Sequence, residues 1–387
     1  MANAANLVNF GTSGLNIGDW TYSLGPLNAP AYLPLNDATV LYLTSSYVTL
    51  AAVIDNPYYS FTTTAQSIGA NGGSYYSAVA SNGTTTVSVV YGTPGGASLS
   101  AVSSTDLINW TFRTMPSAAY WSSVTYGGGT FVAVAQLTAA ASSSCTVAAT
   151  STNGTTWTSR TLPTAAQWLC VIYANAQFIA VAMNGTAAAT SPDGITWTAR
   201  TLPASADWSA IAYGAGLYVT INSNTGVNYY ATSPDGITWT SRTPPYAVGI
   251  GGQNIIFANG IFLLTTNNGR IYTSSDGLTW IFRTQTSAIY PAGRNGSAYG
   301  GGLFVILGGG GTAAATALTS TDGKVWTLRT LPSSQNWQAI TYTGSAFFAT
   351  SQEINGVSMS AVVASTGQFT LPVVTPVTGT QTYVKAT

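Results

Sequence analysis

The chain of 387 residues contains no histidine and very little charge. Lys and Arg together number ten, Asp and Glu together number ten, and the net charge is zero at pH 7. The lack of histidine excludes mechanisms that use a histidine base or a histidine metal ligand. The few basic residues are spread along the chain. We therefore expect no nucleic-acid binding, because neutralising phosphates needs clustered positive charge.

Long apolar runs and a cysteine framework are also missing. No apolar run reaches the roughly 18 to 20 residues that a helix needs to cross a bilayer, so no membrane span is expected. Met1 to Gly14 lacks the basic and apolar regions of a secretory signal. We expect Cys145 and Cys170 to be buried free thiols, with one bridge as the alternative. Hydrophobic residues make up 46% of the chain and aromatic residues 12%, which argues against disorder.

A repeated turn organises most of the sequence. Four copies read SPDGITW, SPDGITW, SSDGLTW and STDGKVW, and two looser copies read STNGTTW and STDLINW. They end at tryptophans spaced 40 to 47 residues apart: Trp110, Trp157, Trp197, Trp239, Trp280 and Trp326. That period is typical of a four-stranded propeller blade. Between the copies lie short runs rich in β-branched and aromatic residues, such as WSAIAYG and LYVTI, which favour strands.

The predicted fold class is therefore all-β, a single β-propeller of four-stranded blades. Degenerate copies at Trp20 and Tyr59 raise the number of fourth strands to eight. We predict eight blades, closed by the N-terminal strand at Trp20, because such a ring leaves no free sheet edge. Seven blades are the alternative, and 365–372 is a second candidate for the last strand. The propeller would span 18–372, between an N-terminal attachment segment at 1–17 and a C-terminal tail segment at 373–387.

The turn motif has a structural interpretation. Asp-Gly between two strands favours a hairpin, because Gly accepts a positive φ and Asp binds nearby backbone amides. The Ser before the Asp adds a second bond, and the Trp packs between neighbouring blades. The Arg that follows pairs with an Asp or covers the Trp. The repeat residues are the six tryptophans and Asp106, Asp193, Asp235, Asp276 and Asp322.

The motif resembles the Asp-box, the S-x-D-x-G-x-T-W turn of sialidases and related BNR-repeat propellers, with one residue fewer between Asp and Gly. In that family the turn is structural and lies away from the ligand face. A sialidase needs three substrate-gripping arginines, yet only Arg270 and Arg294 lie outside the repeat, and Glu353 is the only glutamate. We expect a non-enzyme with no cofactor and no metal site. A degenerate glycosidase that uses Asp207 and Glu353 is the third alternative.

The segments that join the predicted blades supply the candidate ligand site. They read PSAAYW, PTAAQW, PASADW and PSSQNW, and each ends in a polar or tyrosine side chain followed by Trp. Aromatic rings beside amide or carboxylate groups are what sugar binding uses. The alternative is that these tryptophans begin the innermost strands and fill the core. The candidate residues are Tyr120, Trp121, Gln167, Trp168, Asp207, Trp208, Asn336 and Trp337.

Other segments resemble virion proteins of tailed bacteriophages. These are GGGTFVAVA at 127–135, SPDGITWTARTLP at 191–203 and the closing segment at 369–387. The resemblance implies a virion protein that is assembled in the host cytoplasm together with other virion proteins, in a homo-oligomeric assembly. It also implies a fibre-like adhesin that recognises host surface carbohydrate. The runner-up is a decoration or connector protein of the head or tail.

Overall fold

The structure, a computed structural model, describes residues 6–7, 20–23, 32–34, 40–42, 75–93, 96–139, 143–226, 229–245, 250–283, 296–309, 314–352, 361–365, 368–370 and 381–385. These residues form strands and turns and no helix, so none of them forms a helix long and apolar enough to cross a membrane. The contacts divide the chain into two units. One comprises Met1–Ser60 with Ser365–Thr387, and the other comprises Phe61–Ala364.

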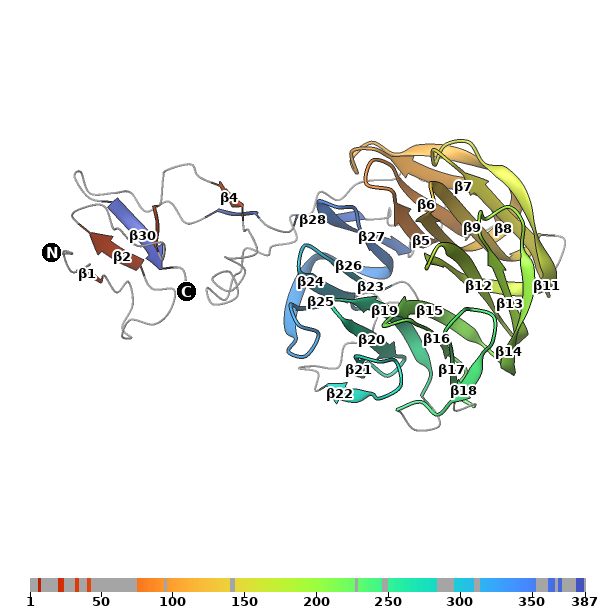
Figure 1. Ribbon diagram of the computed structural model, residues 1–387. Coiled ribbons are helices and arrows are strands. Elements are labelled where there is room, and N and C mark those ends of the chain that lie inside the picture. Colours follow the sequence, from red (N-terminus) through yellow and green to blue (C-terminus); the bar gives the residue numbers. More distant parts are fainter. Residues whose placement is uncertain are drawn as a thin grey trace. The chain divides into compact units, whose positions relative to one another are not determined.

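The larger unit begins with three consecutive antiparallel sets of strands, in which one long strand ends each set and starts the next (Figure 1). β8 pairs with β7 through its first half and with β9 through its second half, and β11 repeats this arrangement. The strands are β5 (Tyr75–Ser81), β6 (Thr86–Thr93), β7 (Gly96–Ser104), β8 (Thr111–Gly127), β9 (Thr130–Thr138), β10 (Cys145–Ser151), β11 (Thr158–Ala174), β12 (Gln177–Met183), β13 (Gly185–Ser191) and β14 (Thr198–Ala206).

Four further sets follow with the same antiparallel order. The fourth and fifth are β15 (Trp208–Gly214), β16 (Leu217–Asn222), β17 (Tyr230–Ser233) and β18 (Thr240–Arg242), then β19 (Gly252–Ala258), β20 (Ile261–Thr266), β21 (Ile271–Ser274) and β22 (Ile281–Arg283). The sixth and seventh are β23 (Ser297–Gly300), β24 (Leu303–Leu307), β25 (Ala314–Ser320) and the first half of β26 (Thr327–Tyr342), then the second half of β26, β27 (Ala346–Gln352) and β28 (Ala361–Ser365).

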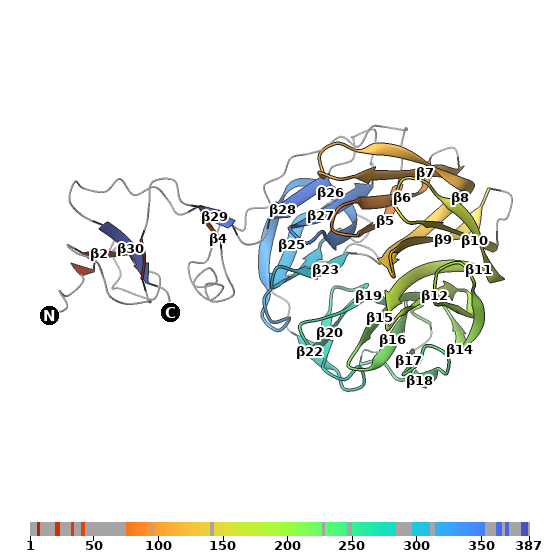
Figure 2. The same cartoon turned by 45° about the horizontal axis from the view of Figure 1, so that its top comes forward.

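The sets follow one another around a common centre (Figure 2). Gln352 of β27 pairs with Tyr75 of β5, so the seventh set lies beside the first. The hydrophobic clusters join neighbouring sets: Trp197, which precedes β14, packs in one cluster with Val132 and Val134 of β9. This arrangement follows from the sequence, because a sheet with two apolar faces is buried only when a sheet covers each face.

The smaller unit brings both ends of the sequence together. Its described strands are β1 (Asn6–Leu7), β2 (Trp20–Ser23), β3 (Tyr32–Pro34), β4 (Val40–Tyr42), β29 (Gln368–Thr370) and β30 (Gln381–Lys385). One sheet has the order β1-β2-β30-β3, and β4 pairs with β29. The C-terminal β30 is therefore the neighbour of the N-terminal β2.

Three sequence predictions concern the residues of this smaller unit. The strand at Trp20, which we expected to close the ring, is β2 and pairs with β1 and β30, so that closure is not confirmed. The boundaries at 18 and 372 stay a prediction, and the contacts group Met1–Ser60 with Ser365–Thr387. The degenerate copy at 53–63 lies outside the described residues.

Candidate functional site

The six turn motifs share one hydrogen-bond pattern, seen clearly at Asp193. Its Oδ1 atom accepts the backbone N–H groups of Ile195 and Thr196 at 2.8 and 2.9 Å, and it accepts the Ser191 hydroxyl at 3.0 Å. The Ser191 hydroxyl oxygen in turn accepts the N–H of Gly194 at 2.8 Å. The two side chains thus bond the amides that the turn leaves without strand partners.

Asn153 occupies the Asp position in one turn and makes the same bonds. Its Oδ1 atom accepts the N–H groups of Thr155 and Thr156 at 2.9 and 3.0 Å. The turn therefore needs an accepting oxygen and does not need a charge. The backbone N–H groups of Thr279 and Leu278 lower the pKa of Asp276 to about 2, because they stabilise its carboxylate form.

We expect acid to weaken these turns at the Asp positions and not at Asn153. Because the folded pKa of Asp276 lies below the usual value, its stabilisation is present above about pH 4 and is lost as the pH falls towards 2. Solvent screening limits the loss to about 1 kcal/mol. Asp276→Asn should therefore reduce the fall in unfolding free energy between pH 5 and pH 2.5 in urea titrations. Asn153→Asp is the reciprocal control and should increase it; equal pH profiles for all three proteins would contradict the prediction.

The Trp of the motif packs between neighbouring sets, and the Arg joins adjacent strands of one set. Trp157, Trp197 and Trp239 are 8% exposed and pack in clusters that include strands of the preceding set. We expected each Arg to meet an Asp or the Trp. The Nε group instead donates to a hydroxyl on the adjacent strand, for example from Arg200 to Thr190 Oγ1 at 3.0 Å. The same bond, at 2.7 to 3.1 Å, recurs in the other five motifs.

The four tryptophans of the joining segments lie in the core. Trp121, Trp168, Trp208 and Trp337 each have 0% exposure at the start of an innermost strand. Trp168 Nε1 donates to Thr164 O and Trp208 Nε1 donates to Ala204 O, both at 3.2 Å, which satisfies the polar end of each ring. A ring buried in this way presents no face to a ligand.

The residues that precede these tryptophans have more varied surroundings. Tyr120, Gln167 and Asp207 are half-buried, whereas Asn336 is buried. Gln167 Nε2 donates to Ser143 O at 2.9 Å, and Asp207 Oδ1 accepts the N–H of Asn184 at 3.2 Å. The first three side chains thus reach the surface at the end of the sheets where the sets are joined.

Three further residues at this end were missed by the sequence analysis. The Tyr91 hydroxyl donates to Gln136 Oε1 at 2.6 Å, and Gln136 Nε2 donates to Gln167 Oε1 at 3.0 Å. The rings of Tyr91 and Tyr120 lie 5.2 Å apart. Tyr229 lies beside Trp208 and donates its hydroxyl to Ser205 O. We call these six half-buried residues the loop-face group: Tyr91, Tyr120, Gln136, Gln167, Asp207 and Tyr229.

The charged residues considered for catalysis are not brought together among the described residues. Glu353 and Arg294 lie outside them. The Arg270 guanidinium lies 6.0 Å from the centre of the Phe282 ring, on the outer part of the fifth set. Both cysteines are buried thiols that form no disulfide, as predicted.

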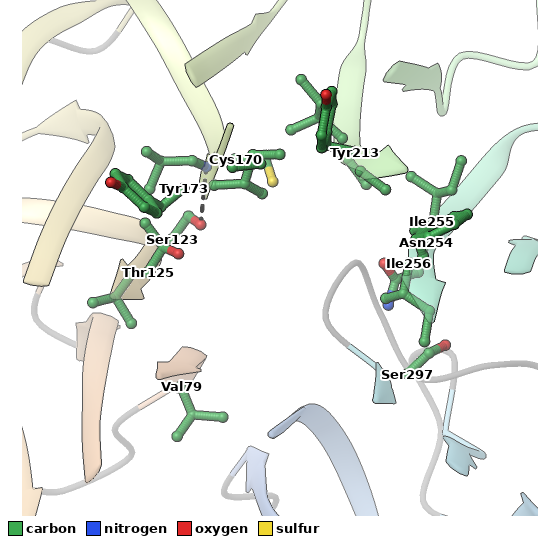
Figure 3. A pocket seen from close by; sticks show the side chains of 18 of the residues that line it. Val79, Ser123, Thr125, Cys170, Tyr173, Tyr213, Asn254, Ile255, Ile256 and Ser297 are labelled. Atoms are coloured by element: carbon green, nitrogen blue, oxygen red, sulfur yellow. Dashed lines mark hydrogen bonds between the residues drawn. The ribbon is translucent and has the colours of Figure 1, made fainter. Parts of the chain in front are cut away.

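A cavity of about 340 Å³ lies at the centre of the larger unit (Figure 3). Its lining comes from the innermost strand of every set: β5, β8, β11, β15, β19, β23 and β26. Most of the lining is aliphatic, with Ser123, Thr125, Asn254 and Ser297 as its polar alcohol and amide side chains. None of the described residues that line it is acidic or basic.

The sequence matches no protein-family description and no curated protein. The structure is similar to solved structures of low sequence identity. Virginiamycin B lyase from Staphylococcus aureus has a TM-score of 0.63 at 12% identity, over 78% of this chain and 98% of that one. YCF48 from Cyanidioschyzon merolae has a TM-score of 0.56 at 15% identity, over 78% and 98%. Streptogramin B lyase has a TM-score of 0.60 at 11% identity, over 76% and 95%.

At identities of 11% to 15%, these neighbours show the fold alone. Virginiamycin B lyase and YCF48 are β-propeller proteins. Together with the strand order and the recurring turns, the likeness shows that the larger unit of this all-β chain is a β-propeller.

Proposed function

We propose that this chain is a non-enzymatic binding propeller of a bacteriophage particle and that it recognises host surface glycan through the loop-face group. The observation that carries the proposal is the clustering of half-buried tyrosine rings with amide and carboxylate side chains at one end of the sheets. The chain of hydrogen bonds from Tyr91 through Gln136 to Gln167 crosses three successive blades and fixes these groups in place. Such a surface offers stacking faces and directional hydrogen bonds to a sugar.

Two observations support a role without catalysis. The central cavity is lined by no charged described residue. A variant of the S. aureus lyase in which a histidine is replaced by alanine is described as catalytically inactive, and the present sequence has no histidine. A lyase reaction that needs a histidine therefore has no counterpart here. The fold also serves in binding, since YCF48 is described with a bound peptide.

We also propose that the propeller has seven blades. The innermost strands of seven sets line one cavity, and the seventh set adjoins the first through Gln352 and Tyr75. The strand at Trp20 is then part of the terminal unit, as the seven-blade alternative requires.

The glycan proposal is tested with labelled full-length protein on candidate host cells, with and without removal of surface polysaccharide. Binding should be lost on removal. Tyr120→Ala and Tyr229→Ala should each weaken binding by about tenfold, because each removes a stacking ring, while thermal melting checks that they fold. The matched control is Ile237→Ser, which alters the opposite end of the sheets and should leave binding unchanged.

A separate observation favours the alternative function, that of a decoration or connector protein. Four of the six turn motifs present an aliphatic side chain at one shared position, and these are 45% to 57% exposed: Ile108, Ile195, Ile237 and Leu278. Exposed apolar side chains at repeated positions suit contact with neighbouring virion proteins. If binding to cells is absent, or if Ile237→Ser weakens incorporation into particles and the tyrosine variants do not, the adhesin proposal fails and the runner-up is favoured.

A further inference from the structure

The innermost strands repeat one residue pattern at the cavity wall. Each innermost strand ends at a hairpin. In the second to fifth sets, the residue three positions before the last residue of this strand is β-branched and aliphatic: Val124, Val171, Ile211 and Ile255. At the same position of the sixth set stands Ser297, three residues before Gly300. One residue further back in the strand, Ser123, Cys170 and Ala210 of the second to fourth sets correspond to Asn254 of the fifth.

Ser297 thus stands where the second to fifth sets have an aliphatic side chain, and the larger amide of Asn254 stands where the second to fourth sets have a small side chain. Asn254 is 5% exposed and Ser297 is 7% exposed, and both line the cavity. The Ser297 hydroxyl is buried without a hydrogen-bond partner. Figure 3 labels both side chains at the cavity, one on β19 and one on the neighbouring strand β23.

An unbonded polar group in such a place is costly to a fold. A buried donor or acceptor without a partner destabilises a protein by about 1 to 3 kcal/mol. The sister blades show that small or aliphatic side chains fit these two positions. A residue that breaks a repeat's own pattern at a cost in stability is expected where it serves a function.

We infer that the central cavity is a binding site for a small, uncharged molecule that has an apolar part and one carbonyl or hydroxyl group. The aliphatic wall holds its apolar part, and Asn254 and Ser297 hydrogen-bond the polar group. A charged ligand is disfavoured, because the described lining offers no opposite charge and burying an unpaired charge is costly. This site is separate from the proposed glycan surface, and the volume of about 340 Å³ suits a small molecule and not an oligosaccharide.

The test uses prodan, an uncharged naphthalene ketone whose fluorescence responds to its surroundings and to hydrogen bonding at its carbonyl. Full-length protein should bind it saturably at one site with a shift of emission to shorter wavelength. Ser297→Val and Asn254→Ala restore the side-chain types of the sister blades, and each should weaken binding by about tenfold. Ser297→Val should not lower the melting temperature, because it removes an unbonded buried hydroxyl. Thr240→Val, on the exposed outer strand β18, is the matched control and should bind as the unaltered protein does.

Competition tests the requirement for an uncharged ligand. The neutral ketone 2-acetylnaphthalene should displace prodan, whereas 2-naphthoate, of similar size but with a carboxylate, should not at the same concentration. Absence of saturable binding, equal displacement by both compounds, or unchanged affinity in both cavity variants would overturn the inference. Because the loop-face variants Tyr120→Ala and Tyr229→Ala should bind prodan normally, this outcome is independent of the glycan test.

Discussion

Replacing Gly194 by alanine should lower the free energy of unfolding by about 3 kcal/mol, whereas the same change at Gly216 should lower it by about 1 kcal/mol. The two glycines have nearly the same left-handed backbone, with φ of +75° and +76°. An added Cβ is strained in that region whatever surrounds it. Gly216→Ala measures this backbone strain alone, because an added Cβ at Gly216 meets nothing within 4 Å.

The additional cost at Gly194 comes from the neighbouring blade. Its added Cβ would lie 2.5 Å from Val132 Cγ2 on β9, and Val132 is 0% exposed. Because Val is branched at Cβ and tightly packed, it cannot turn aside, and overpacking of this kind typically costs about 1 to 3 kcal/mol. Urea unfolding of the two variants and the unaltered protein measures the difference. Equal losses would mean that the turn motif does not fasten adjacent blades.

The repeat of strands and turns could be predicted because its signals are local. Asp-Gly sets the hairpin, and Ser191 and Asp193 bond amides within three residues of themselves. The partner of the strand at Trp20 could not be predicted in this way. The residues around Trp20 resemble a fourth strand, yet their partner is β30, more than 350 residues away in the sequence. Nothing in a four-residue strand specifies so distant a partner.

The candidate site was predicted only in part, for a related reason. Trp serves both as a core residue and as a stacking surface, so its type does not distinguish the two roles. The context does: Trp208 starts β15, in which the next four residues are also buried, because the innermost strand is covered on both faces. Ser297 and Asn254 are ordinary in sequence and become conspicuous only when strand register aligns them with their aliphatic or small counterparts.

Replacing Trp168 by alanine should lower the free energy of unfolding by about 4 kcal/mol, the cost typical of removing a large buried aromatic side chain. Trp168 is 0% exposed and lies in a cluster with Phe178, Trp197 and strands of the preceding blade. Its removal therefore leaves a cavity at a joint between blades. Trp168→Phe, which retains most of the apolar volume, should recover a large part of the loss.

The adjacent residue provides the control for a ligand role. Gln167 is half-buried in the loop-face group, so Gln167→Ala should change the free energy of unfolding by less than about 1 kcal/mol while weakening binding to host cells. Trp168→Phe should do the reverse, with reduced stability and normal binding at temperatures where it remains folded. If Trp168→Phe instead lost binding with no loss of stability, the ring would have to reach the ligand. The burial that separates Trp168 in the core from Gln167 at the surface would then not hold for the protein in solution.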